Sequence, residues 1–223
     1  MMKNIEIKEL GIIDYEEAWN LQKKLLNNLV EAKRLGEEGE MKLLLLEHPH
    51  VYTLGMNGDK ANMLFNDELL ERIGAKFYKI ERGGDITYHG FGQLVGYPII
   101  DLERFNIGIK EYIWRLEEAV IRTIAHYGIS GSRFQGTVGV WIESDASELR
   151  KICAIGVKVS RFVTMHGFAL NVSTDLNYYR YINPCGFKDR GVTSIEVESG
   201  QKPTISEVSA IFKGHFAELF PNT

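Results

Sequence analysis

The chain has 223 residues, of which 44% are hydrophobic and 25% are charged, and its formal charge at neutral pH is −4. This composition is typical of a globular protein that buries a full hydrophobic core, and it excludes a disordered chain. The net negative charge gives no general attraction to nucleic acid or to an anionic membrane, so we expect neither as a partner.

Length alone allows one domain or two. The glycines bunch at residues 83–96, 128–139 and 186–200, which indicates loops within one unit, and we predict a single domain over residues 1–223. Charges interrupt the first residues where a secretory signal needs an apolar run, and no apolar stretch is long enough to span a bilayer. The sequence therefore predicts a cytoplasmic protein whose two cysteines, Cys153 and Cys185, are reduced thiols.

The first predicted elements are a strand and a long helix. Residues 5–10 alternate between apolar and charged side chains, which fits a strand. Asp14 and Glu17 have the spacing of a capping box, so a helix should begin here and run to about Lys33. Apolar side chains recur at helical spacing and predict its buried face. That face consists of Ala18, Leu21, Leu25, Leu29 and Ala32.

Strands are predicted next over residues 42–47, 76–81 and 93–99. A short helix should lie between the first two, capped by Asn66 and ended by Gly74. The clearest helix runs from about Gly108 to Tyr127 and ends where Gly128 can close it. Its predicted apolar stripe is Ile109, Ile113, Leu116, Val120 and Ile124.

The C-terminal half predicts a cluster of strands over residues 138–143, 152–159 and 163–172. Pro203 and Ser206 introduce a last amphipathic helix. Its predicted inward side chains are Val208, Phe212, Phe216 and Leu219. Because strands and helices do not alternate regularly, we predict an α/β (α+β) fold with a mixed β-sheet covered by helices.

A glycine-rich stretch over residues 82–93 combines bare backbone with polar side chains. Glycines remove side chains where a ligand or another strand must approach the backbone. The polar residues between them are Arg82, Thr87, Tyr88, His89 and Gln93. Such a loop suits an extended acyl thioester or a phosphate-bearing group. A tight turn beside a strand corner explains the same glycines equally well.

Cys185 lies between Pro184 and Gly186, so its thiol would be presented at a loop tip with a glycine N–H nearby for an oxyanion. A buried apolar role is the common alternative for a free cysteine. For Cys153, the apolar strand pattern around it predicts such a buried core position.

Lys151 opens a predicted strand that is otherwise apolar. If its ammonium were partly desolvated, it could accept a thiol proton or stabilise a thiolate. The plainer alternative is a solvated lysine at a strand edge. His89 and His166 stay open as partners of the thiol, because histidine is the usual base for a cysteine nucleophile.

The sequence gives little sign of a metal or nucleotide site. His48 and His50 together with a cysteine would make a zinc site, but neither a Cys-x-x-Cys pair nor a helical His-x-x-x-His occurs. The phosphate-loop and dinucleotide fingerprints are also missing. We therefore expect no metal and no cofactor.

Five motifs carry a family resemblance. They are Arg82-Gly-Gly-Asp-Ile-Thr-Tyr-His89, Gln93-Leu-Val-Gly-Tyr-Pro98, Lys151-Ile-Cys-Ala-Ile-Gly156, His166-Gly-Phe-Ala-Leu-Asn171, and Pro184-Cys-Gly186 with Gly191-Val-Thr-Ser194. In this order and at this spacing, the chain resembles the lipoyl(octanoyl) transferase family.

The resemblance implies an acyltransferase that moves an octanoyl group to a protein lysine, the first step of endogenous protein lipoylation. The implied donor is acyl carrier protein. The implied acceptors are the lipoyl domains of 2-oxoacid dehydrogenases and the glycine-cleavage H protein. Transfer would pass through a thioester on Cys185, whose thiol pKa Lys151 would lower. The implied fold is the catalytic core shared by lipoate and biotin protein ligases.

The same matching assigns residues to substrate binding. They are Arg82, Gly83, Gly84, Asp85, Ile86, Thr87, Tyr88 and His89 from the first motif, then Ala154, Ile155 and Gly156, and then Gly167, Phe168 and Ala169. His166 is a further supporting candidate. Phe91 stands where the family commonly has proline, which leaves the acyl-chain preference open.

Three other functions remain possible at this point. An ATP-dependent lipoate ligase of the same fold would need no cysteine. A binding module without catalysis would hold lipoyl domains and form no acyl-protein. A Cys–His thioesterase would use water as its acceptor.

Overall fold

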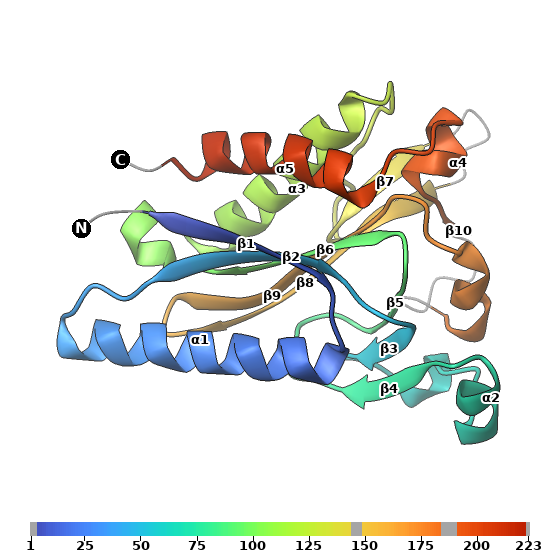
Figure 1. Ribbon diagram of the computed structural model, residues 1–223, viewed down its shortest axis with the longest axis horizontal. Helices are drawn as coiled ribbons and strands as arrows, with labels where there is room; N and C mark the ends of the chain where they lie inside the picture. The colour runs from blue at the N-terminus through green and yellow to red at the C-terminus, as the bar shows by residue number, and fades with distance from the viewer. Residues whose placement is uncertain (1–3, 144–148, 184–190, 222–223) are drawn as a thin grey trace.

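The computed structural model describes residues 4–143, 149–183 and 191–221 (Figure 1). The prediction of a mixed sheet covered by helices is confirmed. Along the main sheet the strands are β1 (Ile5–Ile12), β2 (Met41–Glu47), β6 (Gln93–Ile99), β9 (Val163–Asn171), β8 (Leu149–Ser160) and β10 (Gly191–Val192), and β7 (Val140–Glu143) also pairs with β8. The pairs β1–β2 and β8–β10 are parallel, and the other pairs in this sheet are antiparallel.

A second, three-stranded sheet has the order β4 (Lys76–Lys79), β3 (Val51–Leu54), β5 (Ile86–His89). The sequence patterns predicted β4 but missed β3 and β5, which are only four residues long and carry histidines and glycines at their ends. Their cluster of buried side chains includes Tyr52, Leu54, Ile86 and Tyr88. Through β5, this small sheet brings the glycine-rich motif to the main sheet.

Helices cover both faces of the main sheet (Figure 1). The long helix α1 (Tyr15–Leu35) lies on one face, and α3 (Ile109–Ala125) and α5 (Ile205–Leu219) lie together on the other. The shorter helices are α2 (Asp67–Arg72) and α4 (Ile195–Ser199), and short 3₁₀ segments occupy Lys60–Asn62, Leu102–Phe105 and Leu176–Tyr181. No helix in the described ranges is long and apolar enough to cross a membrane.

Helix α1 begins where the sequence predicted, because the Asp14 carboxylate accepts a hydrogen bond from the Glu16 N–H at 2.9 Å. Its buried face differs from the prediction. Gln22 is fully buried, whereas the predicted Leu21 and Leu25 lie half-buried at the margin. The reason is a long-range contact: the Gln22 side-chain oxygen accepts the His166 backbone N–H at 2.9 Å.

Helix α3 shows the same kind of correction. Leu116, Val120 and Ile124 are buried as predicted, but Ile109 is 45% exposed at the first turn. Glu117 is buried instead, where its carboxylate accepts the Gly139 N–H at 3.0 Å and pairs with Arg133. A buried carboxylate is tolerated when it is paired and hydrogen-bonded, and a pattern of apolar spacing does not reveal it.

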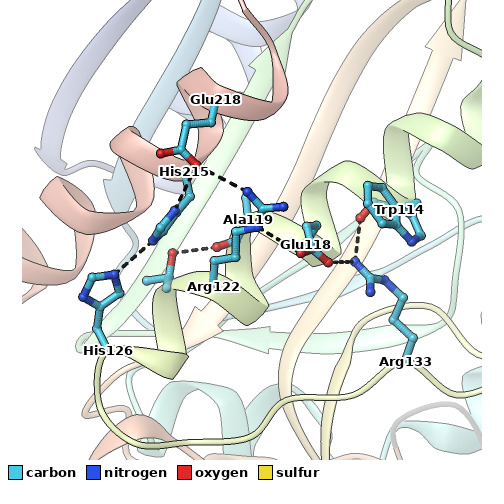
Figure 2. A network of polar contacts seen from close by, with 9 residues as sticks. Trp114, Glu118, Ala119, Arg122, His126, Arg133, His215 and Glu218 are labelled. Carbon is cyan, nitrogen blue, oxygen red and sulfur yellow. Dashed lines mark hydrogen bonds and ion pairs between the residues drawn. The ribbon is translucent and has the colours of Figure 1, made fainter.

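Polar side chains join α3 to α5 along their outer surface (Figure 2). Arg122 on α3 lies 3.3 Å from the Glu218 carboxylate on α5. The Nε2 atoms of His126 and His215 are 3.1 Å apart. Helix α5 itself starts with a capping box between Thr204 and Glu207, where the sequence had pointed to neighbouring residues.

The core between α5 and the sheet is aromatic. Val208, Phe212 and Phe216 are buried as predicted, while Leu219 is half-buried at the edge of the same cluster. The ring centroids of Phe212 and Phe168 are 4.4 Å apart, which joins α5 directly to β9. Aromatic pairs of this kind contribute beyond the area they bury.

We predict that Phe212→Ala lowers the free energy of unfolding by about 3–5 kcal/mol, because it leaves a cavity between α5 and β9. Urea denaturation of the purified protein measures this. The matched control is Leu35→Ala, because Leu35 is 58% exposed at the end of α1, and its effect should stay within about 0.5 kcal/mol. Equal losses in the two variants would contradict this description of the core.

Candidate functional site

A cavity of about 260 Å³ lies beside β8 and β9. Three predicted motifs line it together. The first motif contributes Arg82, Gly84, Asp85, Ile86, Thr87 and His89. Strand β8 contributes Lys151, Ala154, Ile155 and Gly156. Strand β9 contributes His166, Gly167, Phe168 and Ala169.

Backbone pairing explains why segments far apart in sequence meet here. In the antiparallel pair β8–β9, Ala154 lies opposite Ala169, and Gly156 lies opposite Gly167. The loop before β5 lies against this pair, because the Gly83 N–H donates to the Val157 carbonyl at 2.9 Å. A Cβ on Gly156 would come within 2.9 Å of the Gly83 carbonyl oxygen. Glycine at 156 is therefore required for the loop to lie this close.

Gly83 and Tyr88 were predicted to bind substrate, but neither lines the cavity. Gly83 instead anchors its loop to β8. Tyr88 is fully buried, and its hydroxyl is hydrogen-bonded to His50 Nδ1 at 2.7 Å. These two residues hold the loop and the strand that carry the lining residues.

Arg82 is buried, with 8% of the residue exposed, and it lines the cavity. Its Nη2 donates to the Thr53 carbonyl oxygen at 2.7 Å and to the Thr53 hydroxyl at 3.1 Å, and its Nη1 donates to the Gly83 carbonyl at 3.0 Å. These bonds to the second sheet fix the cation in place, and a buried charge needs such partners.

Both candidate histidines are buried and neutral. Burial, together with the neighbouring His48, lowers the pKa of His89 to about 3. Burial and the Arg82 charge lower the pKa of His166 to about 3. An imidazole with so low a pKa is a weak base for a thiol that titrates near ~8.5. The electrostatics of the cavity therefore argue against either histidine as the thiol's base.

Lys151 is not at a strand edge and does not open its strand, since β8 begins at Leu149. At this end β8 pairs with β7 on one side and with β10 on the other, and Lys151 lies opposite Trp141 and Val192. Its carbonyl accepts the Thr193 N–H at 3.0 Å. Its half-buried side chain lines the cavity, with Nζ 4.5 Å from the centre of the Trp141 ring.

The prediction for Cys153 is confirmed: it is a core residue, fully buried on β8. Burial raises the pKa of its thiol, which makes it a poor nucleophile. Cys185 lies outside the described residues. Gly191 and Val192, which follow Cys185 in the sequence, both line the cavity beside Lys151.

Several lining residues were not predicted. Tyr15 and Tyr97 line the cavity from α1 and β6, Trp141 lines it from β7, and Asn171 and Tyr179 complete one wall. Tyr97 and Asn171 stand within quoted motifs, so motif membership was the available signal for them. Nothing in the local pattern marks Tyr15 or Trp141, because both read as ordinary apolar positions.

Phe91 and the two histidines of the His-Pro-His segment lie elsewhere. Phe91 is 45% exposed against the edge of His50 and does not line the cavity. His48 donates from Nδ1 to the Ile13 carbonyl at 2.8 Å and accepts from the Tyr97 hydroxyl at 2.8 Å. Among the described residues, no three side chains of the metal-binding types could hold an ion together.

The comparisons with known proteins agree with the motifs. The family described as the lipoyl protein ligase A/B catalytic domain matches residues 14–217. An octanoyltransferase of Bacteroides fragilis is 56% identical over 197 residues, which cover 88% of this chain and 89% of that protein. An octanoyltransferase of Flavobacterium psychrophilum is 49% identical across all of this chain and 99% of that protein.

The chain belongs to the octanoyltransferase family. Solved structures support the same fold for this chain. A bipartite lipoate protein ligase of Thermoplasma acidophilum superposes with a TM-score of 0.68 at 16% identity, over 97% of this chain and 84% of that one. A biotin protein ligase of Aquifex aeolicus superposes with a TM-score of 0.54 at 12% identity, over 96% of this chain and 70% of that one. The expected core shared with lipoate and biotin ligases is confirmed.

We predict that the His89 and His166 imidazoles stay neutral between pH 8 and pH 5, as their lowered pKa values require. Nitrogen-15 NMR of the two rings would measure this directly. The unfolded chain binds protons near ~6.5, so each histidine should reduce the free energy of unfolding by up to about 1.4 kcal/mol per pH unit below that value. A midpoint above pH 5.5 for either ring would contradict the proposed electrostatics.

Proposed function

We propose that this chain transfers an octanoyl group to a lysine of a lipoyl domain through a thioester on Cys185. The observation that carries this proposal is the cavity, where Lys151, the glycine-rich loop and the β8–β9 pair meet. Beside Lys151 the cavity wall includes Gly191, six residues after Cys185 in the chain. A segment this short limits how far Cys185 can lie from the cavity, to roughly 20 Å at full extension.

In the first step, the Cys185 thiolate attacks the carbonyl carbon of the donor thioester. The bond between the acyl carbon and the donor sulfur breaks, and the donor leaves as a thiol after taking a proton. Lys151 supports this step, because a cation beside a thiol favours the thiolate. We propose acyl carrier protein as the donor.

In the second step, the lysine amine of the acceptor attacks the acyl carbon on Cys185. An amide forms, the sulfur leaves, and the proton lost by the amine returns to the thiol or to solvent. Because the two protein substrates react in turn at one cysteine, ping-pong kinetics follow. The proposed acceptors are the lipoyl domains of 2-oxoacid dehydrogenases and the glycine-cleavage H protein.

The walls of the cavity fit a short acyl chain. Ile86, Ile155 and Phe168 give it an apolar surface, and Arg82 lies beside them. Its volume is about 260 Å³. We favour the transferase over an ATP-dependent ligase, because relatives that are 49–56% identical to this chain are octanoyltransferases.

The proposed compartment is the cytoplasm, because a nucleophilic thiol has to stay reduced. Substrate contacts are proposed for Arg82, Gly84 to Thr87 and His89, for Ala154 to Gly156, and for Gly167 to Ala169, with Gly83 and Tyr88 in supporting positions. His166 is proposed to shape the cavity as a neutral group.

The first test is the intact mass of the protein after incubation with octanoyl-loaded carrier protein and without ATP. We expect the gain of one octanoyl group, mapped by peptide digestion to Cys185. Cys185→Ser should lose the adduct, whereas the matched variant Cys153→Ala should keep it. Transfer that proceeds in the Cys185→Ser variant, or only with ATP, would favour the ligase.

The second test concerns Lys151. We expect Lys151→Ala to raise the pKa of the Cys185 thiol toward its ordinary value near ~8.5, measured by alkylation rate against pH in a Cys153→Ala background. Acyl transfer should fall on the order of 10²-fold. Lys151→Arg keeps the charge but cannot accept a proton, so recovery by arginine would assign an electrostatic role. An unchanged thiol pKa in Lys151→Ala would remove Lys151 from the mechanism.

A further inference from the structure

The Trp141 ring and the Lys151 ammonium lie close together in the cavity wall. The two residues lie directly opposite each other in the antiparallel pair β7–β8. Side chains at opposed positions project to the same face of a sheet. The Lys151 Nζ is 4.5 Å from the centre of the Trp141 ring, within the range of a cation–π contact, for which tryptophan is the strongest partner.

Trp141 is held rigidly. It is 2% exposed. On the side away from β8, its backbone is hydrogen-bonded to Ser132. The Trp141 N–H donates to the Ser132 carbonyl at 3.0 Å, and the Trp141 carbonyl accepts the Ser132 N–H at 2.8 Å. The β7–β8 register shifts here: Val140 lies opposite Cys153 and Trp141 lies opposite Lys151, so β8 carries one extra residue, Ile152, as in a β-bulge. Bulges occur next to active sites, where they re-aim a side chain.

Gly139, just before the bulge, ties this strand to α3. Its φ of 117° suits glycine alone, and a Cβ there would lie 2.5 Å from the Cys153 carbonyl oxygen. The Gly139 N–H donates to the buried Glu117 carboxylate at 3.0 Å. Glu117 is held in turn by Arg133, whose guanidinium also contacts Glu118 and the Trp114 carbonyl (Figure 2).

We propose that Trp141 is a positioning residue that holds the Lys151 ammonium over its ring face, at the mouth of the acyl site. The bulge and the Glu117–Gly139 bond fix the position of the Trp141 ring, and the ring fixes the position of the Lys151 ammonium. This inference rests on the proposed role of Lys151. Trp141 touches the lysine, so it acts on the reaction only through the place and charge of the ammonium.

Fluorinated tryptophan tests this contact without changing the shape of the side chain. Fluorine withdraws electron density from the ring face and so weakens its attraction for a cation. The chain has three tryptophans, so Trp19→Phe and Trp114→Phe together leave Trp141 as the one labelled ring. We expect kcat for acyl transfer to fall stepwise with each added fluorine, while the donor KM stays constant.

A second readout does not depend on activity. The fluorine NMR signal of the labelled Trp141 should differ between the wild-type lysine and Lys151→Met at the same pH. In the natural background, Trp141→Leu should lower kcat about two- to thirtyfold, the equilibrium factor of one cation–π contact, with Trp141→Phe between. The matched control is Trp19→Leu, which removes a cation–π contact with Lys23 at 4.0 Å on α1, outside the cavity, and it should stay within twofold.

The outcomes separate the two claims. If Lys151→Met abolishes transfer, but fluorination leaves the rate unchanged and the fluorine signal of Trp141 is the same in wild type and Lys151→Met, the role of Trp141 is refuted and the proposed function stands. If Lys151→Met leaves transfer unchanged, the role of Lys151 is refuted, and the positioning role of Trp141 is refuted with it. A loss in Trp141→Leu that Trp19→Leu matches would also overturn the proposal.

Discussion

The antiparallel pairing of β8 with β9 determines where every other part of the cavity must lie. This pair aligns residues 154–156 with residues 167–169, so two motifs face each other through backbone hydrogen bonds alone. The glycine-rich loop then lies against the pair, because Gly156 leaves room for the Gly83 carbonyl. A side chain at 156 would push away the loop that carries Arg82 and, with it, one wall of the cavity.

A chain of buried amides extends this arrangement to the rest of the site. His89 Nδ1 lies 2.9 Å from the Gln93 side-chain oxygen, and the Gln93 amide donates to Asn171 at 2.9 Å. Asn171 donates in turn to the Thr193 carbonyl at 2.9 Å, just after β10. Buried polar groups are costly unless they are bonded. This network therefore fixes the segment next to Lys151 relative to the small sheet.

Most of the fold followed from local pattern, because the strands β2, β6 and β9 and the helix α3 have apolar runs with clear ends. The errors share one cause. Gln22 bonds to His166 and Glu117 bonds to Gly139, and both partners are more than 20 residues away in sequence. No local periodicity encodes such a contact. The short strands β3 and β5 were missed for a similar reason, since β3 is defined by its pairing with β4 and β5, and β5 by its pairing with β3.

The sequence motifs predicted which residues belong to the site, but not how these residues are arranged in space. Motifs named the residues that line the cavity from β8, β9 and the first loop, whereas Trp141 and Tyr15 enter it only through tertiary packing. The plainer alternative for Lys151, a solvated side chain at a strand edge, does not hold, because β7 and β10 flank it on both sides. The neighbouring strands determine how far the Lys151 side chain is exposed to solvent. The sequence of β8 alone does not show which strands lie beside it.

The central claim is that an acyl group on Cys185 lies in this cavity with Lys151 beside the sulfur. A crystal structure of the protein with an octyl ketone joined to Cys185 through a stable thioether tests it most directly. The account predicts that the alkyl chain lies against Ile155 and Phe168, and that the Lys151 Nζ lies within about 4 Å of the reacting sulfur, the range of an ion pair. An alkyl chain outside the cavity, or a sulfur far from Lys151, would contradict it.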